Sequence, residues 1–361
     1  MHSLELIKPD GRRMTLYSHS PLNPQLKAPS PFAAPLSGAS HLRWHPLRGE
    51  WVTYAAHRQG RTFMPPPEYN PLAPTRDPLH PTEVPEGAWD IAVFENRFPS
   101  LGGLVTPPPP LIVPTAPADG RCEVVVFTQD ADGSLGTLPL DDIAMLFEVL
   151  GDRTLRLGAE PAIQYVMPFE NRGTESGVTL HHPHGQIYAY PLVPPVPARM
   201  QQLALEHYTS HGRVLLEQHI AAERKDTVRM LYEGEHAVAF VPVCARYPYE
   251  VWVAPIRAVS GFMELSDAER MDLARALKTV LRKYDLLWDR RLPYLLTWYQ
   301  APTDGTTHPE WHLHAQLWPP YRTRDRLKFL AGTELGAGFF AMDVLPEDKA
   351  LELQQVKVGL L

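Results

Sequence analysis

His182-Pro183-His184-Gly185-Gln186 leads directly into the run Ile187-Tyr188-Ala189-Tyr190. The aromatic and branched side chains of this run predict a β-strand. Residues two apart on a strand share one face of the sheet. We therefore expect the two imidazoles and the amide of the motif to point toward a single place.

These side chains suit chemistry at phosphorus. A histidine can attack phosphorus through a ring nitrogen and later leave, and a neutral amide donates hydrogen bonds without supplying a titratable proton. The motif indicates transfer of a nucleotidyl group through a covalent histidine intermediate. Glutamine cannot protonate a leaving group or activate water, so we favour transfer over hydrolysis.

The second half of the chain repeats the plan of the first. The first half is predicted to contain a strand at 123–127, a helix at 141–157, a strand at 163–168 and then the motif. The second half has a strand at 250–255, a helix at 266–287, a strand at 294–299 and then Trp311-His312-Leu313-His314-Ala315-Gln316. This order indicates an internal duplication.

The pattern predicts an α+β fold. Two strands that bracket a helix in each half favour mainly antiparallel sheets, joined as a half-barrel, with helices packed on the sheet. Prolines cluster at 64–85, 107–117 and 191–197, where they predict loops because proline opposes helix. The last cluster separates two predicted domains, 1–195 and 196–361.

Composition narrows the class of protein. The 361 residues, 44% hydrophobic and 21% charged, can bury a sizeable core. A net charge of -7 argues against a nucleic-acid partner. Cys122 and Cys244 form no metal or disulfide motif, which favours a reducing cytoplasm. The opening residues do not resemble a signal peptide, and no apolar run is long enough for a membrane span.

Four motifs together resemble a known family. They are Phe94-Glu95-Asn96-Arg97-Phe98-Pro99, Phe169-Glu170-Asn171-Arg172-Gly173, the motif at 182–186, and Lys328-Phe329-Leu330-Ala331-Gly332-Thr333-Glu334. In this order they are similar to the galactose-1-phosphate uridylyltransferases of the histidine-triad superfamily. The resemblance implies that UDP-glucose gives its UMP to a histidine and that galactose 1-phosphate then collects it as UDP-galactose.

The resemblance assigns roles to individual residues. His184 matches the nucleophile, and Gln186 matches the group that hydrogen-bonds the phosphoryl oxygens. The implied substrate-binding residues are Arg58 and Arg61 near the phosphates, Phe94, Asn96 and Phe98 around uridine, Asn171, Gly177 and Thr179 near the diphosphate, and Lys328 and Glu334, which would reach the hexose phosphate of the partner subunit. His182 is counted with the site as well, and we expect it to orient the motif through hydrogen bonds. A homodimer with shared active sites is thus implied.

Metal sites of the family are expected to be lost. Relatives often hold zinc with a C-x-x-C pair, a distant histidine and the first histidine of the motif. Here the matching stretches read Asn70-Pro71-Leu72-Ala73 and Gln129-Asp130-Ala131-Asp132, which leaves only His182. A second metal site would require ligands where this chain has Met200, Tyr299, His314 and Gln316. We expect no bound metal and no cofactor required for the chemistry.

Two other hypotheses remain open. A nucleoside-diphosphate-hexose phosphorylase would use the same histidine with inorganic phosphate or another nucleotide as acceptor. A nucleotide-binding module that has lost catalysis would bind UDP-glucose without turnover, although an intact His184 and Gln186 argue against it.

Overall fold

The computed structural model describes residues 1–361 except 37, 61–64, 66–68, 104–106 and 360–361. Its helices are α1 (Leu140–Gly158), α2 (Pro195–His211), α3 (Leu215–Asp226), α4 (Asp267–Leu287), α5 (Gly332–Ala337) and α6 (Pro346–Gln355). The strands of the first half are β1 (His2–Ile7), β2 (Arg13–Ser18), β3 (His41–His45), β4 (Glu50–Tyr54), β5 (Ile91–Glu95), β6 (Thr115–Pro117), β7 (Arg121–Val126), β8 (Tyr165–Arg172) and β9 (His184–Tyr190). Those of the second half are β10 (Met230–Glu233), β11 (Ala237–Phe240), β12 (Val251–Pro255), β13 (Tyr294–Tyr299), β14 (His314–Trp318), β15 (Tyr321–Thr323) and β16 (Arg326–Leu327).

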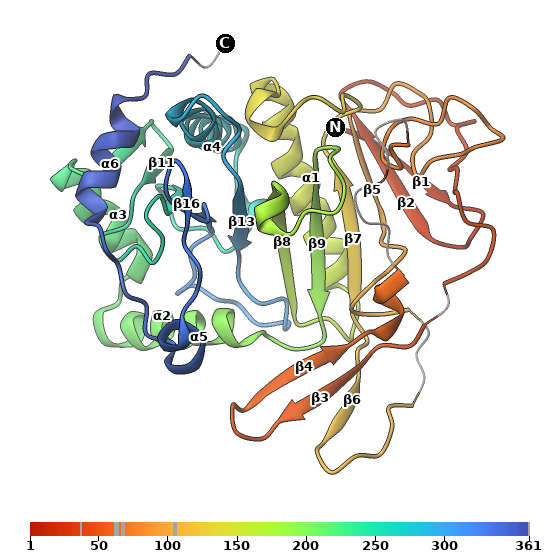
Figure 1. The fold of residues 1–361 in the computed structure, drawn as a ribbon, viewed down its shortest axis with the longest axis horizontal. Coiled ribbons are helices and arrows are strands. Elements are labelled where there is room, and N and C mark those ends of the chain that lie inside the picture. The colour runs from red at the N-terminus through yellow and green to blue at the C-terminus, as the bar shows by residue number, and fades with distance from the viewer. Residues whose placement is uncertain (37, 61–64, 66–68, 104–106, 360–361) are drawn as a thin grey trace.

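One antiparallel sheet runs through both halves (Figure 1). Its eleven strands follow the order β1-β2-β5-β7-β9-β8-β13-β14-β12-β11-β10. The order is symmetric about the β8–β13 pair, since β9 and β14 flank it and β7 and β12 follow. This arrangement agrees with a duplicated α+β unit whose two sheets are joined edge to edge.

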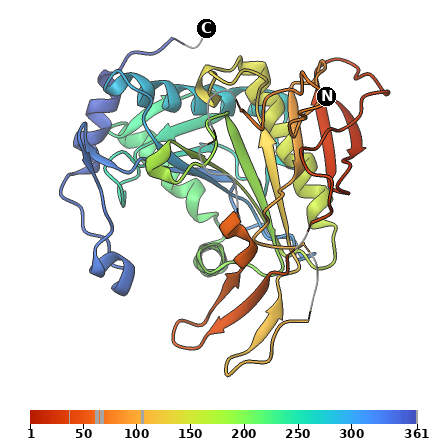
Figure 2. The same cartoon turned by 45° about the vertical axis from the view of Figure 1, so that its right-hand side comes forward.

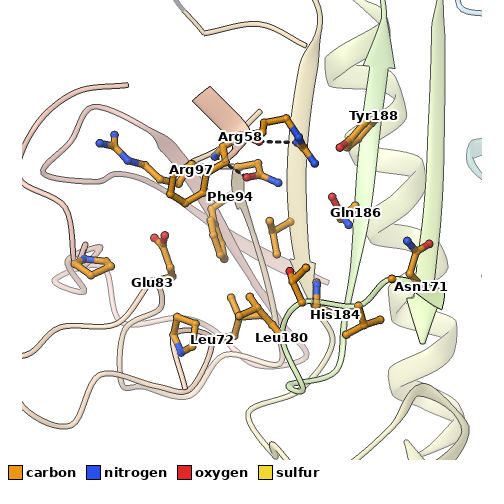
Figure 3. A pocket seen from close by; sticks show the side chains of 18 of the residues that line it. Arg58, Leu72, Glu83, Phe94, Arg97, Asn171, Leu180, His184, Gln186 and Tyr188 are labelled. Atoms are coloured by element: carbon orange, nitrogen blue, oxygen red, sulfur yellow. Dashed lines mark hydrogen bonds between the residues drawn. The ribbon is translucent and has the colours of Figure 1, made fainter. Parts of the chain in front are cut away.

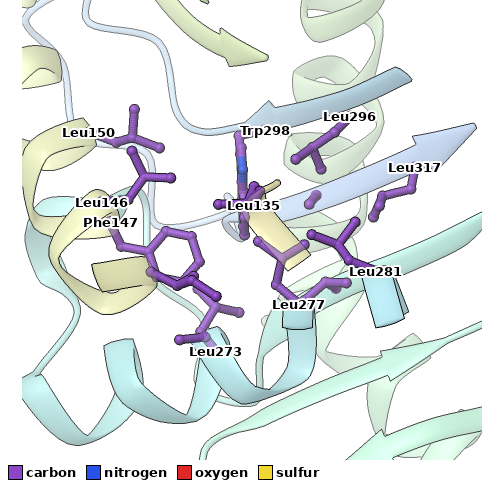
Figure 4. Packing of buried hydrophobic residues seen from close by; sticks show 14 of the residues in the cluster. Leu135, Leu146, Phe147, Leu150, Leu273, Leu277, Leu281, Leu296, Trp298 and Leu317 are labelled. Carbon is purple, nitrogen blue, oxygen red and sulfur yellow. The ribbon is translucent and has the colours of Figure 1, made fainter. Parts of the chain in front are cut away.

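Helices α1 and α4 cover one face of this sheet, and a single hydrophobic core lies between them and the strands (Figure 4). Phe147 of α1 packs edge-on against Trp298 of β13, with ring centroids 5.2 Å apart. Helix α4 begins at a capping box, in which Ser266 and Glu269 bond each other's backbone N–H groups. The core therefore joins residues of the two halves into one packed unit.

The opposite face of the sheet differs between the halves. In the second half, α3 packs on it, and Ile220 joins Val238, Phe240 and Ala254 in a small buried cluster. In the first half, loops surround this face. The face of the sheet that carries the first His motif therefore remains open at a pocket.

Several parts of the fold had no counterpart in the sequence prediction, among them β10–β11, α3 and two groups of N-terminal strands. The hairpin β1–β2 extends the sheet beyond β5, and a separate three-stranded sheet has the order β4-β3-β6. Figure 2 shows that the C-terminal segment with α5 projects from the body of the molecule. In the part of the chain that the structure describes, no helix is both long and apolar enough to cross a membrane.

The prediction that the proline cluster at 191–197 forms only a loop is wrong. Helix α2 begins at Pro195, and Pro197 lies in its first turn. The first turn tolerates proline because its N–H groups have no partner within the helix.

Candidate active site

A pocket opens above strand β9 on the face away from α1 and α4 (Figure 3). Burial alternates along this strand, so Gly185 and Ile187 face the core whereas His184, Gln186 and Tyr188 line the pocket. Gly185 leaves no room for a larger residue, because an added Cβ would lie 2.7 Å from the ring of Phe127. The strand thus presents an imidazole and an amide side by side to the cavity.

The tautomer of His184 follows from one hydrogen bond. Its Nδ1 lies 2.8 Å from the carbonyl oxygen of His182. A carbonyl can only accept, so Nδ1 carries the proton and Nε2 has a free lone pair. Nε2 has no hydrogen-bond partner among the described residues. Burial lowers the pKa of His184 below its usual 6.5, which keeps the ring neutral and nucleophilic.

His182 does not join His184 in this pocket, so the expected convergence of both rings is wrong. Strand β9 begins only at His184, and Pro183 precedes it, so the two-residue alternation does not extend back to His182. His182 is 2% exposed. Its Nε2 lies 2.8 Å from the Thr128 carbonyl oxygen, and its Nδ1 lies 2.9 Å from the Asn70 amide nitrogen.

The residues expected around uridine all line the pocket. Phe94 of β5 faces it, and Asn96 and Phe98 follow that strand. The Asn96 Oδ1 accepts from the Phe98 backbone N–H at 2.8 Å, and Arg58 donates to the Phe98 carbonyl at 2.6 Å (Figure 3). Arg58 therefore uses one of its N–H groups to hold the loop that contains Phe98. Arg61 lies outside the described residues.

The residues expected near the diphosphate also line the pocket. Asn171 lies near the end of β8, and Gly177 and Thr179 follow in the next loop. Gly177 has a φ of 78°, a left-handed conformation that glycine adopts without strain. The structure thus brings Asn171, Gly177 and Thr179 beside His184 and Gln186.

Lys328 and Glu334 do not lie in this pocket. They form a buried ion pair at 3.0 Å in the segment around α5. Glu334 also accepts from the Ala331 backbone N–H at 2.7 Å, and so caps the start of α5. Within one chain, this pair shapes the C-terminal segment.

Several lining residues escaped the sequence analysis. Tyr188 could have been found, because it continues the two-residue alternation from Gln186. No pattern in the sequence indicated that Glu83 would line the pocket. Its carboxylate is buried against Lys8 and Arg12 of the N-terminal hairpin, each 2.7 Å away, and Lys8 lies over the Phe94 ring at 4.8 Å.

In the second His motif, both ring nitrogens of His314 are engaged by neighbouring protein groups. His314 Nδ1 donates to the His312 carbonyl at 2.9 Å, as in the first copy, but Gln316 Nε2 lies 3.2 Å from His314 Nε2. The Tyr299 ring stacks on His314 with centroids 5.3 Å apart. Burial lowers the pKa of His314 to about 4. No nitrogen of this ring is available to a substrate.

Strand register shows which residues stand beside the second motif in place of the lining of the first. Phe169 pairs with Gln186 and Thr297 with Gln316, so Tyr299 occupies the place of Asn171. In the same way, Trp252 pairs with Gln316 where Val124 pairs with Gln186. Two large aromatic rings therefore replace an amide and a small side chain.

The residues at both expected metal positions are a poor fit for a metal ion. His182 and His314 each have both ring nitrogens engaged in hydrogen bonds. Across the described ranges, no three side chains of His, Cys, Asp or Glu cluster as metal ligands would. A tetrahedral zinc site needs about four protein donors.

Comparisons with known proteins agree with this geometry. Family models described as the N-terminal and C-terminal domains of galactose-1-phosphate uridyl transferase match residues 32–194 and 201–358. A galactose-1-phosphate uridylyltransferase of Thermotoga maritima is 37% identical over 326 residues, which cover 88% of this chain and 99% of the relative. One of Rattus norvegicus is 31% identical, covering 87% of each chain.

Solved structures share the fold. A structure titled uridylyltransferase has a TM-score of 0.77 and 32% identity, and the match covers 87% of this chain and 97% of that one. An ADP-glucose phosphorylase of Arabidopsis thaliana shares the fold, with a TM-score of 0.65 and 24% identity over 89% of this chain and 100% of that one. The chain belongs to the galactose-1-phosphate uridylyltransferase family.

Proposed function

We propose that this enzyme transfers UMP from UDP-glucose to galactose 1-phosphate through a uridylyl group carried on His184. The observation that carries the mechanism is the free Nε2 of His184, which faces the pocket beside the Gln186 amide. The products are UDP-galactose and glucose 1-phosphate.

The chemistry takes two steps. In the first, His184 Nε2 forms a bond to the α-phosphorus while the bond from that phosphorus to the bridging oxygen breaks, and glucose 1-phosphate leaves. In the second, a phosphate oxygen of galactose 1-phosphate attacks the same phosphorus and the N–P bond breaks. The His182 carbonyl stabilises the proton on Nδ1 as positive charge develops on the ring.

Gln186 stabilises the charge that gathers on the phosphoryl oxygens. One well-placed donor of this kind contributes about 2.7–4 kcal/mol to lowering a barrier. Because an amide cannot remove a proton from water, the site offers no general base at this position for hydrolysis. Arg58, Asn171 and Thr179 line the same pocket and supply further donors to the diphosphate.

We also propose that the protein works without the two metals of its relatives. Asn70, His182, His314 and Gln316 at those positions are hydrogen-bonded to protein groups, and none of the steps above requires a metal ion. Metal analysis of the purified enzyme, together with activity after dialysis against a chelator, tests this proposal.

We propose a homodimer with shared active sites, because the projecting C-terminal segment exposes apolar side chains. Phe329 and Phe339 are 76% and 73% exposed within one chain, which suits a surface covered by a second copy. The buried pair of Lys328 and Glu334 would fix the shape of this segment as it reaches the partner. We expect the enzyme in the cytoplasm, because its two cysteines are both unpaired.

The test is to follow the intermediate directly. Incubation with UDP-glucose should add one UMP to the intact protein, place it on His184 and release glucose 1-phosphate. Galactose 1-phosphate should then discharge it. A protein that is never labelled would overturn the proposal, and discharge by inorganic phosphate alone would identify a phosphorylase instead.

A further inference from the structure

We propose that Asn70 is a positioning residue for the nucleophile, acting through His182. Its side-chain amide holds the His182 ring in one tautomer and orientation, and the His182 carbonyl in turn holds Nδ1 of His184. This inference deepens the proposed function and rests on it, because it assigns the group that aims His184 Nε2 at phosphorus.

The orientation of the Asn70 amide is determined by its own loop. Its Oδ1 accepts from the Leu72 backbone N–H at 3.0 Å, as in an Asx-turn. The amide nitrogen is therefore the end that faces His182 Nδ1, at 2.9 Å. Asn70 is half-buried, and Leu72 beside it is fully buried, so packing holds the turn in place.

One nitrogen of the His182 ring must donate a hydrogen bond, and the other must accept one. Nε2 faces the Thr128 carbonyl and must donate, whereas Nδ1 faces an N–H donor and must accept. Only the neutral tautomer with its proton on Nε2 satisfies both bonds. Because the ring is almost fully buried, water cannot replace either partner.

This anchoring is passed to His184 through the backbone. The ring of His182 is held on both sides, and Pro183 has a fixed φ, so the His182 carbonyl between them has little freedom. That carbonyl accepts from His184 Nδ1 at 2.8 Å. Moving it would rotate the nucleophilic ring, and a misplacement of about 1 Å can cost about 100-fold in rate.

The second copy provides an internal comparison. There, His312 Nε2 donates to the Pro255 carbonyl at 2.8 Å, and the His312 carbonyl accepts from His314. His312 Nδ1, however, is buried without a hydrogen-bond partner among the described residues. The strand motif therefore forms without an Asn70 equivalent, and the extra bond is found in the copy whose histidine faces the open pocket.

Asn70 also stands where the family resemblance places a metal ligand. A metal bond would fix the His182 ring from outside the strand, and the amide does so here with a neutral hydrogen bond. In this structure, the hydrogen bonds of Asn70 and Thr128 hold the His182 ring.

The test uses Asn70→Asp, which keeps the size of the side chain and the acceptor for Leu72. It replaces the donor to His182 Nδ1 by an acceptor. We expect uridylylation in a single turnover to slow by about 10- to 100-fold, with UDP-glucose affinity near that of the wild type. Nitrogen NMR of histidine-labelled protein should show that His182 leaves its Nε2-protonated tautomer.

The chain offers a matched control. Asn23-Pro24-Gln25 has the same local turn, in which the Gln25 N–H bonds the Asn23 side chain at 2.9 Å, but Asn23 is exposed. Asn23→Asp should label at the wild-type rate. If Asn70→Asp does not fold, Asn70→Ser and Asn70→Ala are compared instead. Only the serine variant keeps a hydrogen-bond donor, so it should be uridylylated faster than the alanine variant.

The outcomes separate this inference from the function it rests on. A wild-type enzyme that forms no uridylyl intermediate would refute the proposed function, while NMR could still show whether Asn70 sets the His182 tautomer. A wild type that labels normally, with Asn70→Asp equally fast and the His182 resonances unchanged, would refute the role of Asn70 alone.

Discussion

Gln316 Nε2 lies 3.2 Å from His314 Nε2, and it thereby occupies the nitrogen that remains free in His184. The two copies of the motif share a backbone but differ in what the second ring nitrogen can do. We predict that His184→Ala removes all labelling by UDP-glucose even though His314 is intact. Intact-mass measurement checks this, and UMP found on His314 would contradict it.

Gln186→Ala should leave the nucleophile in place but remove a donor to the phosphoryl oxygens. We expect the single-turnover rate of uridylylation to fall by about 10²–10³-fold, as for the loss of one oxyanion donor. UDP-glucose binding should change much less, because the ground state carries less charge at those oxygens. Equal losses in binding and rate would indicate a ground-state contact instead.

The rate of uridylylation should depend on pH in one direction. Burial lowers the His184 pKa below 6.5, so the neutral ring predominates above that pH and the rate should be flat there. In more acidic solution Nε2 becomes protonated and the rate should fall. Rapid-quench measurements across this range test the prediction. A rate that rises toward acid pH would mean that an acid catalyst limits the first step.

Two adjacent arginines should differ sharply in their effect on stability. Arg12 is buried and bonds Asp10 and Glu83, so Arg12→Ala leaves two buried carboxylates short of a cation and should cost about 3–5 kcal/mol. Arg13 is 55% exposed, and Arg13→Ala should cost at most about 1 kcal/mol. Urea unfolding of both variants gives the comparison.

Loss of Arg12 should also weaken UDP-glucose binding, because Glu83 lines the pocket. Calorimetry at a temperature where the variant is folded measures this effect. Unchanged affinity would show that the N-terminal hairpin stabilises the fold without shaping the nucleotide site.

Local patterns predicted the middle of the central sheet and the helices α1 and α4 that cover it. The strand at 294–299 and the helix from Ser266 matched β13 and α4, since both have strong periodicity and the helix has a capping box. His184 and Gln186 were predictable because they share a strand face. The failure at His182 has a local cause, since the strand begins after it.

The remaining parts of the site depend on contacts between distant segments. Glu83 meets Lys8 and Arg12 only after the N-terminal hairpin pairs with β5, and no local pattern signals that pairing. Asn70 lies far from His182 in the chain and reaches it through a proline-rich loop. Such partners are fixed by tertiary packing, which a single sequence does not reveal.

Strand β13 of the second half pairs with β8, which carries Asn171 of the candidate active site. Phe169 lies opposite Thr297 and Asn171 opposite Leu295, so the second half supplies backbone partners to the strand that brings Asn171 to the pocket. Without β13, this strand would become a bare edge, open to pairing with other chains. His314 of the second copy offers no free ring nitrogen, yet the strand that carries Asn171 depends on that copy for half of its backbone pairing.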